Sequence, residues 1–491
     1  MNFPNGILVT TLALGMLQCQ DPPLPAGLGG QEAKPTPTQQ EPEPGLPAGL
    51  GSDPEPGLPA GLQPGAGEAT ESNEQPLADT FSASRFTERL GLTGFFETRL
   101  GARTQKDPYE RDLSISEARL RLELDRQFDR YVLKVGGDLI VDPLLGSWQP
   151  DLESGHGFFD LREASIATSP LSWLDLKLGR QVLTWGTGDL LFINDLFPKD
   201  WVSFFVGRDD EYLKAPSDAL RIGMFSELAN IEFVVTPRFD ADRFIRGDRV
   251  SYYNPMLGRQ AGRDAVQDPQ QPDGWFTDPE FSARVYRNLA GFELAAYGYV
   301  GRWKSPGGFD PITARGTFPQ LSVYGASART QLLGGIANVE AGYYDSRQDP
   351  GGRNPLIENS QMRVLVGFER DLPELANSLT VGAQYYLEAM ANHDNYLATL
   401  AGGTPARDEL RHVVTLRVSK LLLEQRLRIS VFAYVSPSDH DMYLRPNASY
   451  TIDDSWSVSV GANIFAGEDN DTFFGQFDRN TNVYAAVRVS F

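Results

Sequence analysis

The feature that most constrains the fold of this chain is a strand-like alternation of apolar and polar residues. It recurs in runs of about ten residues, most clearly at 118–125, 362–369, 426–435 and 456–464. Because successive side chains of a strand point to opposite faces, each run has one apolar face and one polar face. Runs of this length, separated by turns, are typical of strands that cross a membrane as a closed barrel.

We predict about eighteen strands, near residues 90–103, 115–125, 131–141, 158–168, 173–184, 217–225, 229–237, 281–289, 291–303, 320–330, 334–346, 360–370, 378–390, 410–420, 425–436, 441–452, 455–466 and 482–491. The connections alternate in length. Long ones, such as 185–216 and 238–280, follow odd-numbered strands, and short ones, such as Arg126–Arg130 and Ser169–Ser172, follow even-numbered strands. A soluble β-protein has no reason to sort its connections in this way. The sequence therefore predicts an all-β, antiparallel, up-and-down transmembrane barrel, preceded by a disordered Pro/Gly-rich segment.

Composition agrees with a barrel and excludes other classes. The chain of 491 residues is too long for one ordinary core unless that core is a barrel or a repeat. No run of 18 apolar residues exists, so a transmembrane helix is not expected. The formal net charge of −21 argues against nucleic-acid binding. With one cysteine, Cys19, the chain cannot form an intramolecular disulfide.

Residues 1–19 are predicted to be an export signal, because an apolar run from Ile7 to Leu17 has signal-peptide length. Cys19 follows this run directly, as the acylated cysteine of a lipoprotein does, but Gln18 stands where a small residue is expected. Two alternatives stay open for Cys19: lipidation, or an incidental thiol in a discarded leader.

Residues 20–80 form a low-complexity, acidic, Pro/Gly-rich segment. The pentapeptide Leu-Pro-Ala-Gly-Leu occurs at 24–28, 46–50 and 58–62. Such a composition cannot bury a core, so we expect a disordered periplasmic linker. It is either a plain tether or an arm that contacts the cell wall. The barrel is then assigned to residues 81–491.

The last ten residues, Asn482–Phe491, alternate strictly and end the chain on an aromatic residue. This ending resembles the C-terminal signature of bacterial outer-membrane barrels, in which Phe491 would close the barrel. The resemblance implies the outer membrane of a Gram-negative bacterium. It also implies outer-membrane lipid, lipopolysaccharide and the barrel-assembly machinery as partners.

A second resemblance covers roughly 25 residues. The chain reads Gly-Arg-Gln at 179–181, Trp-Gly at 185–186, and an Asp…Pro…Asp pattern at 195–200. This segment is similar to one in porin-like outer-membrane barrels, including alginate-export-like porins and related uncharacterised families. The resemblance implies a transport function, and nothing in the segment is catalytic.

Most charged residues of the predicted strands fall on the inner face. Reading inward positions from the alternation gives the following lumen residues: Arg119, Arg121, Glu123, Asp125, Arg221, Arg284, Arg363, Arg417, Arg426, Arg428, Arg445 and Arg488. The arginines either form a basic ladder that guides anionic or zwitterionic solutes, or pair with lumen acids and fill a hydrated interior. Charge must point inward in both cases, because the lipid face penalises it.

The long connection 185–216 is too apolar for a loop that is surrounded by water. We expect it to fold into the barrel mouth and narrow it, with Trp185, Asp189, Asp195, Asp200 and Trp201 as constriction residues. The alternative is an external cap that packs on neighbouring loops. Acidic residues of this and other long loops are interpreted as solvated surface in preference to a calcium site.

Catalysis is not expected. The four histidines, His156, His393, His412 and His440, have no spacing that fits a metal site, and no Gly-x-Ser-x-Gly elbow is present. We predict no cofactor and no metal. The predicted function is a channel for passive passage of small, anionic solutes. The alternatives are a substrate-specific transporter of polymers or hydrophobic compounds that works with periplasmic partners, and a structural barrel linked to the cell wall.

Overall fold

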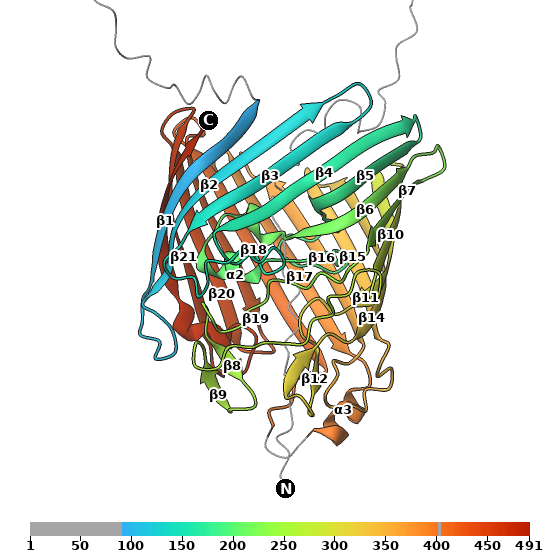
Figure 1. Cartoon of the computed structure of the whole chain (residues 1–491), viewed down its shortest axis with the longest axis vertical. Coiled ribbons are helices and arrows are strands. Elements are labelled where there is room, and N and C mark those ends of the chain that lie inside the picture. Colours follow the sequence, from blue (N-terminus) through green and yellow to red (C-terminus); the bar gives the residue numbers. More distant parts are fainter. Residues whose placement is uncertain (1–90, 401–403) are drawn as a thin grey trace, which may run out of the picture.

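The computed structural model describes residues 91–400 and 404–491, so the predicted signal, Cys19 and the predicted linker lie outside the described residues. Eighteen strands form one sheet (Figure 1). These strands are β1 (Leu92–Arg103), β2 (Leu113–Gln127), β3 (Val132–Val141), β4 (Phe159–Leu171), β5 (Leu174–Val182), β6 (Pro216–Met224), β7 (Asn230–Thr236), β10 (Glu280–Leu289), β11 (Phe292–Arg302), β14 (Gln320–Leu332), β15 (Gly335–Ser346), β16 (Gln361–Asp371), β17 (Leu379–Met390), β18 (Leu410–Leu422), β19 (Leu427–Ser436), β20 (Asp441–Thr451), β21 (Trp456–Gly467) and β22 (Asn482–Ser490).

The sheet closes on itself. Each of these strands pairs antiparallel with the next one along the chain, and β22 pairs with β1 from Phe95–Ser490 to Arg103–Asn482. Phe491 extends this closure, because its backbone exchanges two hydrogen bonds of 3.0 Å with Gly94. A closed barrel leaves no unpaired edge in lipid. The predicted fold class, an antiparallel transmembrane barrel of about eighteen strands, is confirmed.

The predicted sorting of connections by length is also confirmed. The short turns gather at one end of the barrel, the turn end, and the long connections at the other, the loop end (Figure 1). One connection at the loop end is short, at residues 437–440. The longer ones carry the hairpins β8 (Tyr252–Asn254) with β9 (Arg259–Ala261) and β12 (Gly308–Asp310) with β13 (Arg315–Thr317), the helix α3 (His393–Thr399) and the 3₁₀ helix η2 (Gly475–Asn480).

The outer face of the barrel is apolar. On β16, Met362 and Val366 are 41% and 50% exposed, whereas Arg363 between them is 1% exposed and points into the lumen. Alternation of this kind is expected where lipid surrounds the barrel. Within the described ranges, no helix is long and apolar enough to cross a membrane.

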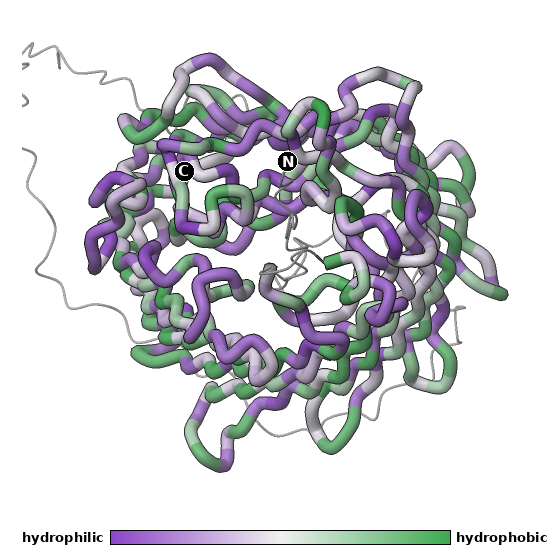
Figure 2. Tube along the Cα trace, turned by 90° about the horizontal axis from the view of Figure 1, so that it is seen from below, coloured by the Kyte–Doolittle hydropathy of each residue, from purple (hydrophilic) through white to green (hydrophobic). Residues whose placement is uncertain are grey.

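The hydrophobic core lies inside the barrel. Inward-pointing aromatic residues of β15 to β22, such as Tyr344, Tyr434 and Tyr443, are almost completely buried. Figure 2 looks into the barrel from the loop end and shows chain segments that cross the inside of the ring of strands. These segments bury the aromatic residues, and they form the candidate functional site.

Candidate functional site: a barrel lumen crossed by one long loop

Residues 183–215, between β5 and β6, fold into the barrel. We call this segment the lumen loop; it contains the helix α2 (Trp201–Val206) and the 3₁₀ helix η1 (Asp210–Leu213). Figure 1 shows α2 at mid-height inside the ring of strands. The alternative of an external cap is therefore wrong, and the apolar composition of the loop is explained by what it packs against.

A buried carboxylate anchors the first part of the lumen loop. Glu340, on the inner face of β15, is 1% exposed. Its carboxylate accepts hydrogen bonds from three backbone N–H groups: Thr187 at 2.9 Å, Gly188 at 3.1 Å and Asn194 at 2.7 Å. A carboxylate is suited to this role because it only accepts hydrogen bonds and binds N–H donors more strongly than a neutral acceptor does. Residues 187–194 are thereby held against the wall of the barrel.

Neighbouring inward side chains hold the backbone of the same segment. Asn338 donates its side-chain amide to the carbonyl of Thr187 at 2.9 Å. The hydroxyl of Tyr434 donates to the carbonyl of Leu190 at 3.0 Å, and the hydroxyl of Tyr344 donates to the carbonyl of Ile193. Backbone groups that would otherwise be unpaired inside the barrel are thus satisfied by the strands.

Helix α2 is short and is defined by its two caps. Asp200 accepts a hydrogen bond from the backbone N–H of Ser203 at 2.7 Å, which is the usual role of aspartate before a helix. Gly207 ends the helix with φ of 87°, a left-handed conformation that favours glycine. A Cβ atom at this position would lie 2.3 Å from the ring of Tyr484, so glycine also permits the close approach to β22.

Aromatic packing holds α2 against the wall formed by β20 and β21. The ring of Phe205 lies 5.5 Å from that of Tyr443, 5.2 Å from that of Phe465 and 4.9 Å from that of Phe477. Phe204 adds a further contact with Tyr443 at 5.7 Å. Both phenylalanines are 1% exposed.

The last part of the lumen loop is held by ion pairs with wall arginines. Asp209 bonds Arg99 at 2.6 Å and also pairs with Arg488, whereas Asp210 pairs with Arg445. Burial alone would raise the pKa of Asp209, but the guanidinium groups of Arg99 and Arg488 outweigh burial and lower it. These contacts fasten the loop to β1, β20 and β22, across the lumen from its origin at β5.

Most of the predicted lumen arginines also lie on the inner face and pair with acids. Arg119 bonds Glu117 at 2.7 Å and also pairs with Asp138, Arg284 bonds Glu232 at 2.6 Å, and Arg363 lies 3.3 Å from Glu388. The other inward residues and their partners are Arg121 with Glu123 and Asp138, Asp125 with Lys134, Arg221 with Glu232, Arg417 with Asp189, Arg445 with Asp210, and Arg488 with Glu97 and Asp209. The geometry thus favours the paired alternative over an unbroken basic ladder.

Two predicted arginines differ from this pattern. Arg426 lies in the exposed turn between β18 and β19, so its assignment to the lumen strand is wrong; the strand begins one residue later, at Leu427. Arg428 lies on the inner face of β19 and makes no ion pair with another described residue. It is therefore the predicted lumen arginine whose charge is least balanced by a neighbour.

The predicted constriction residues all belong to the lumen loop, and they have different roles. Trp185 packs on Phe197 at 5.0 Å, and Trp201 donates its indole N–H to Asp242 at 3.1 Å. Asp195 bonds Lys199 at 3.0 Å, and Asp200 caps α2. Asp189 accepts a hydrogen bond from Arg417 at 2.8 Å.

The interpretation of this loop's acids as solvated surface is wrong for Asp195, Asp200, Asp209 and Asp210. They lie inside the barrel and neutralise cations, because the loop that carries them turns inward. Burial raises the pKa of Asp189 to about 6, although the ion pair with Arg417 acts in the opposite direction. Among the residues that the structure describes, no three metal-ligating side chains cluster.

Three of the four histidines make side-chain contacts in the described part of the chain. His156 pairs with Asp248 at 3.1 Å, His393 contacts the carbonyl of Arg407 at 2.8 Å, and His412 contacts the hydroxyl of Tyr385 at 2.7 Å. None of these three contacts places a histidine against a serine, threonine or cysteine side chain.

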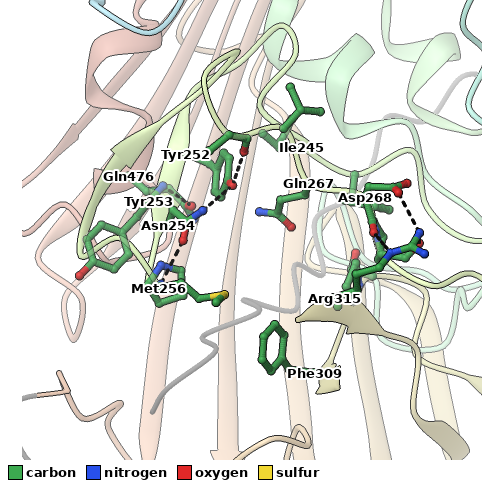
Figure 3. A pocket seen from close by; sticks show the side chains of 18 of the residues that line it. Ile245, Tyr252, Tyr253, Asn254, Met256, Gln267, Asp268, Phe309, Arg315 and Gln476 are labelled. Atoms are coloured by element: carbon green, nitrogen blue, oxygen red, sulfur yellow. Dashed lines mark hydrogen bonds and ion pairs between the residues drawn. The ribbon is translucent and has the colours of Figure 1, made fainter. Parts of the chain in front are cut away.

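Two cavities lie on either side of the lumen loop. The first, of about 410 Å³, is lined by connections of the loop end together with Trp201 and Phe205 of the lumen loop. We call it the mouth cavity (Figure 3). The second, of about 320 Å³, lies toward the turn end; residues 208–211 form one side of it and the inner face of β19 to β22 the other. We call this one the inner cavity. The lumen loop is thus a partition between the two.

Comparison with known proteins gives similarity of fold only. No family model matches the sequence, and no curated protein matches it. Similar structures include OccAB3 of Acinetobacter baumannii, with 11% identity and a TM-score of 0.48, covering 82% of this chain and 98% of that one. Another is Wzi of Escherichia coli, an outer-membrane protein described as a carbohydrate-binding β-barrel, with 12% identity and a TM-score of 0.46, covering 83% and 86%. At these levels of similarity the comparisons carry no conclusion beyond the closed barrel described above.

Proposed function

We propose that this protein is an outer-membrane channel through which small water-soluble solutes diffuse, and that the lumen loop sets its narrowest part. The single observation that carries this proposal is the position of the lumen loop. It crosses a closed barrel at mid-height, between two cavities that lie toward opposite ends. A loop folded into the lumen reduces the cross-section without sealing the barrel by a separate plug domain.

We further propose that the turn end faces the periplasm and the loop end faces the outside, as in other outer-membrane barrels. The short turns and the closing strand support this orientation. Outer-membrane lipid, lipopolysaccharide and the barrel-assembly machinery are the partners that it implies. The predicted linker at residues 20–80 would then lie in the periplasm.

The charges around the inner cavity support a weak preference for anions. Its lining includes five cationic residues, Arg208, Arg417, Arg428, Arg445 and Arg488, and four acidic ones, Glu97, Asp209, Asp210 and Glu211. Because most of these residues form ion pairs, the electrostatic potential in the cavity is set mainly by the charge that has no opposite partner. Arg428 supplies that excess, beside the hydroxyl groups of Ser430 and Ser449 on the same wall.

The test is the reversal potential of the full chain in a planar bilayer that separates two KCl concentrations. We expect open channels with a modest preference for chloride, and a loss of that preference in Arg428→Gln. Arg426→Gln is the matched control, because it removes the same charge two residues away, in the exposed turn. A barrel that never conducts would contradict the channel, whereas equal effects of the two substitutions would contradict the role of Arg428.

A further inference from the structure

The mouth cavity has the features of a ligand site that is separate from the constriction. Its walls come from the β7–β10 connection (residues 237–279), the β11–β14 connection (residues 303–319) and η2, and its volume of about 410 Å³ lies within the usual range for small-molecule sites, about 300–1,000 Å³. Seven aromatic side chains line it, among them Phe244, Phe309 and Phe477. Connections from three parts of the barrel thus converge on one largely apolar chamber.

The charge of this cavity is balanced. The charged residues that line it are Asp268 and Arg315, which bond each other at 2.8 Å. Arg315 also donates to the backbone carbonyl of Asp268 at 2.6 Å. In Figure 3 this pair lies at one side of the chamber. An ionic ligand would therefore be desolvated without gaining a free opposite charge.

Most polar groups of the lining are already used by the protein. The side chain of Asn254 donates to the hydroxyl of Tyr252 at 2.9 Å and accepts from two backbone N–H groups, at 3.0 and 3.2 Å. Gln476 accepts from the backbone N–H of Tyr253 and donates to a carbonyl, and Ser305 donates to Asp242. A sugar, which needs many hydrogen bonds to replace those of water, would find few partners here.

Figure 3 shows the side chain of Gln267 projecting into the chamber, between Tyr252 on one side and Asp268 with Arg315 on the other; its amide also lies within reach of the Tyr252 hydroxyl. Met256 and Val266 add half-exposed apolar surface to the rim, at 45% and 41%. The chamber therefore offers aromatic faces, a flexible thioether and one projecting amide. This combination fits a flat apolar molecule that carries one hydrogen-bonding group.

We propose that the mouth cavity binds a small, neutral, ring-containing organic molecule, with aromatic residues around the ring and Gln267 at its polar group. Binding requires only the assembled loops. A barrel that does not conduct can therefore still bind, and a conducting barrel can fail to bind, so this proposal and the channel proposal fail separately.

The test is equilibrium dialysis of 1-naphthol against the full chain in lipid nanodiscs, with empty nanodiscs as the reference. 1-Naphthoate and glucose serve as the charged and the sugar-like comparisons. We expect saturable binding of 1-naphthol in excess of the empty discs, with a Kd at least about tenfold lower than that of either comparison. Binding of glucose or naphthoate at equal or higher affinity would overturn the proposal, as would uptake of naphthol no greater than that of empty discs.

Two substitutions locate the site. Gln267→Trp removes the amide and puts a bulky ring into the chamber, and Gln267→Glu places an unpaired charge there. Each is expected to raise the Kd for 1-naphthol at least about tenfold. Leu257→Trp and Leu257→Glu are matched controls, because Leu257 lies in the same connection, is 48% exposed and does not line the chamber. Unchanged affinity in both Gln267 variants, with an intact barrel by circular dichroism, would place the ligand elsewhere and overturn the assignment.

Discussion

Removing the carboxylate of Glu340 should release the first part of the lumen loop. In Glu340→Ala, the backbone N–H groups of Thr187, Gly188 and Asn194 lose their acceptor in a buried place. Each unsatisfied N–H costs about 1–3 kcal/mol, so even the lower figure gives about 3 kcal/mol for the three. Since 1.4 kcal/mol is a factor of ten, the undocked fraction of the loop should rise on the order of 100-fold.

Glu340→Gln should have a smaller effect because the amide keeps one acceptor. The two carboxylate oxygens serve different donors: one accepts from Thr187 and Gly188, and the other from Asn194. Whichever way the amide turns, its NH₂ group faces at least one N–H donor. With one to two N–H groups unsatisfied, we expect a loss of about 1–2 kcal/mol, or a rise of the undocked fraction of roughly five- to thirtyfold.

Hydrogen exchange followed by mass spectrometry, on the barrel in nanodiscs, measures this directly. The amides of residues 187–194 should exchange on the order of 100-fold faster in Glu340→Ala, with Glu340→Gln in between. Glu293→Ala is the control, since Glu293 is an exposed carboxylate on β11 that makes no contact with the loop in the described structure. Equal protection in all variants would show that Glu340 does not anchor the loop.

Two further predictions concern the same loop. Because burial raises the pKa of Asp189 to about 6, the preference for chloride should increase as the pH falls from 8 to 5. In Asp189→Asn, the chloride preference at every pH should equal that of the unsubstituted protein at pH 5. A pH dependence in Asp189→Asn equal to that of the unsubstituted protein would contradict this. Because the pKa of Asp189 is raised when the loop is docked, protonation of this residue between pH 8 and 5 favours the docked loop and should not release it. Phe205→Ala should lower the free energy of unfolding in urea by about 3–5 kcal/mol, because it leaves a cavity beside Tyr443 and Phe465. Phe276→Ala is the control: this side chain is 79% exposed, so its loss should leave the free energy of unfolding almost unchanged.

The strands could be predicted from the sequence because the membrane imposes a simple rule on them. Lipid outside the barrel and a wet or packed interior produce the two-residue period of each strand. In an up-and-down barrel, successive connections lie at opposite ends, so short turns and long loops alternate along the chain. The errors lie at the ends of strands, where the rule weakens. Arg426 continues the alternation of the inward-pointing residues of β19, but it lies in the turn before the strand. Nothing in the alternation marks where the strand begins.

The sequence alone does not reveal the anchors of the lumen loop, because each is a pairing between distant parts of the chain. Glu340 and Asn194 are 146 residues apart, and no local pattern links them. One signal was present: Phe432 and Tyr434 occupy inward positions of β19, where a purely water-filled pore would have polar residues. Buried aromatic residues on the inner face indicate that protein packs against that face, and the apolar lumen loop is what covers them.

If the lumen loop sets the narrowest part of a conducting barrel, its removal should change the single-channel conductance. Deleting residues 187–212 leaves a short connection between β5 and β6, whose ends already pair at Val182 and Pro216. We expect a conducting full chain and a larger conductance, with weaker selectivity, after deletion. A folded barrel with the same conductance before and after deletion, or with none in either form, would contradict it.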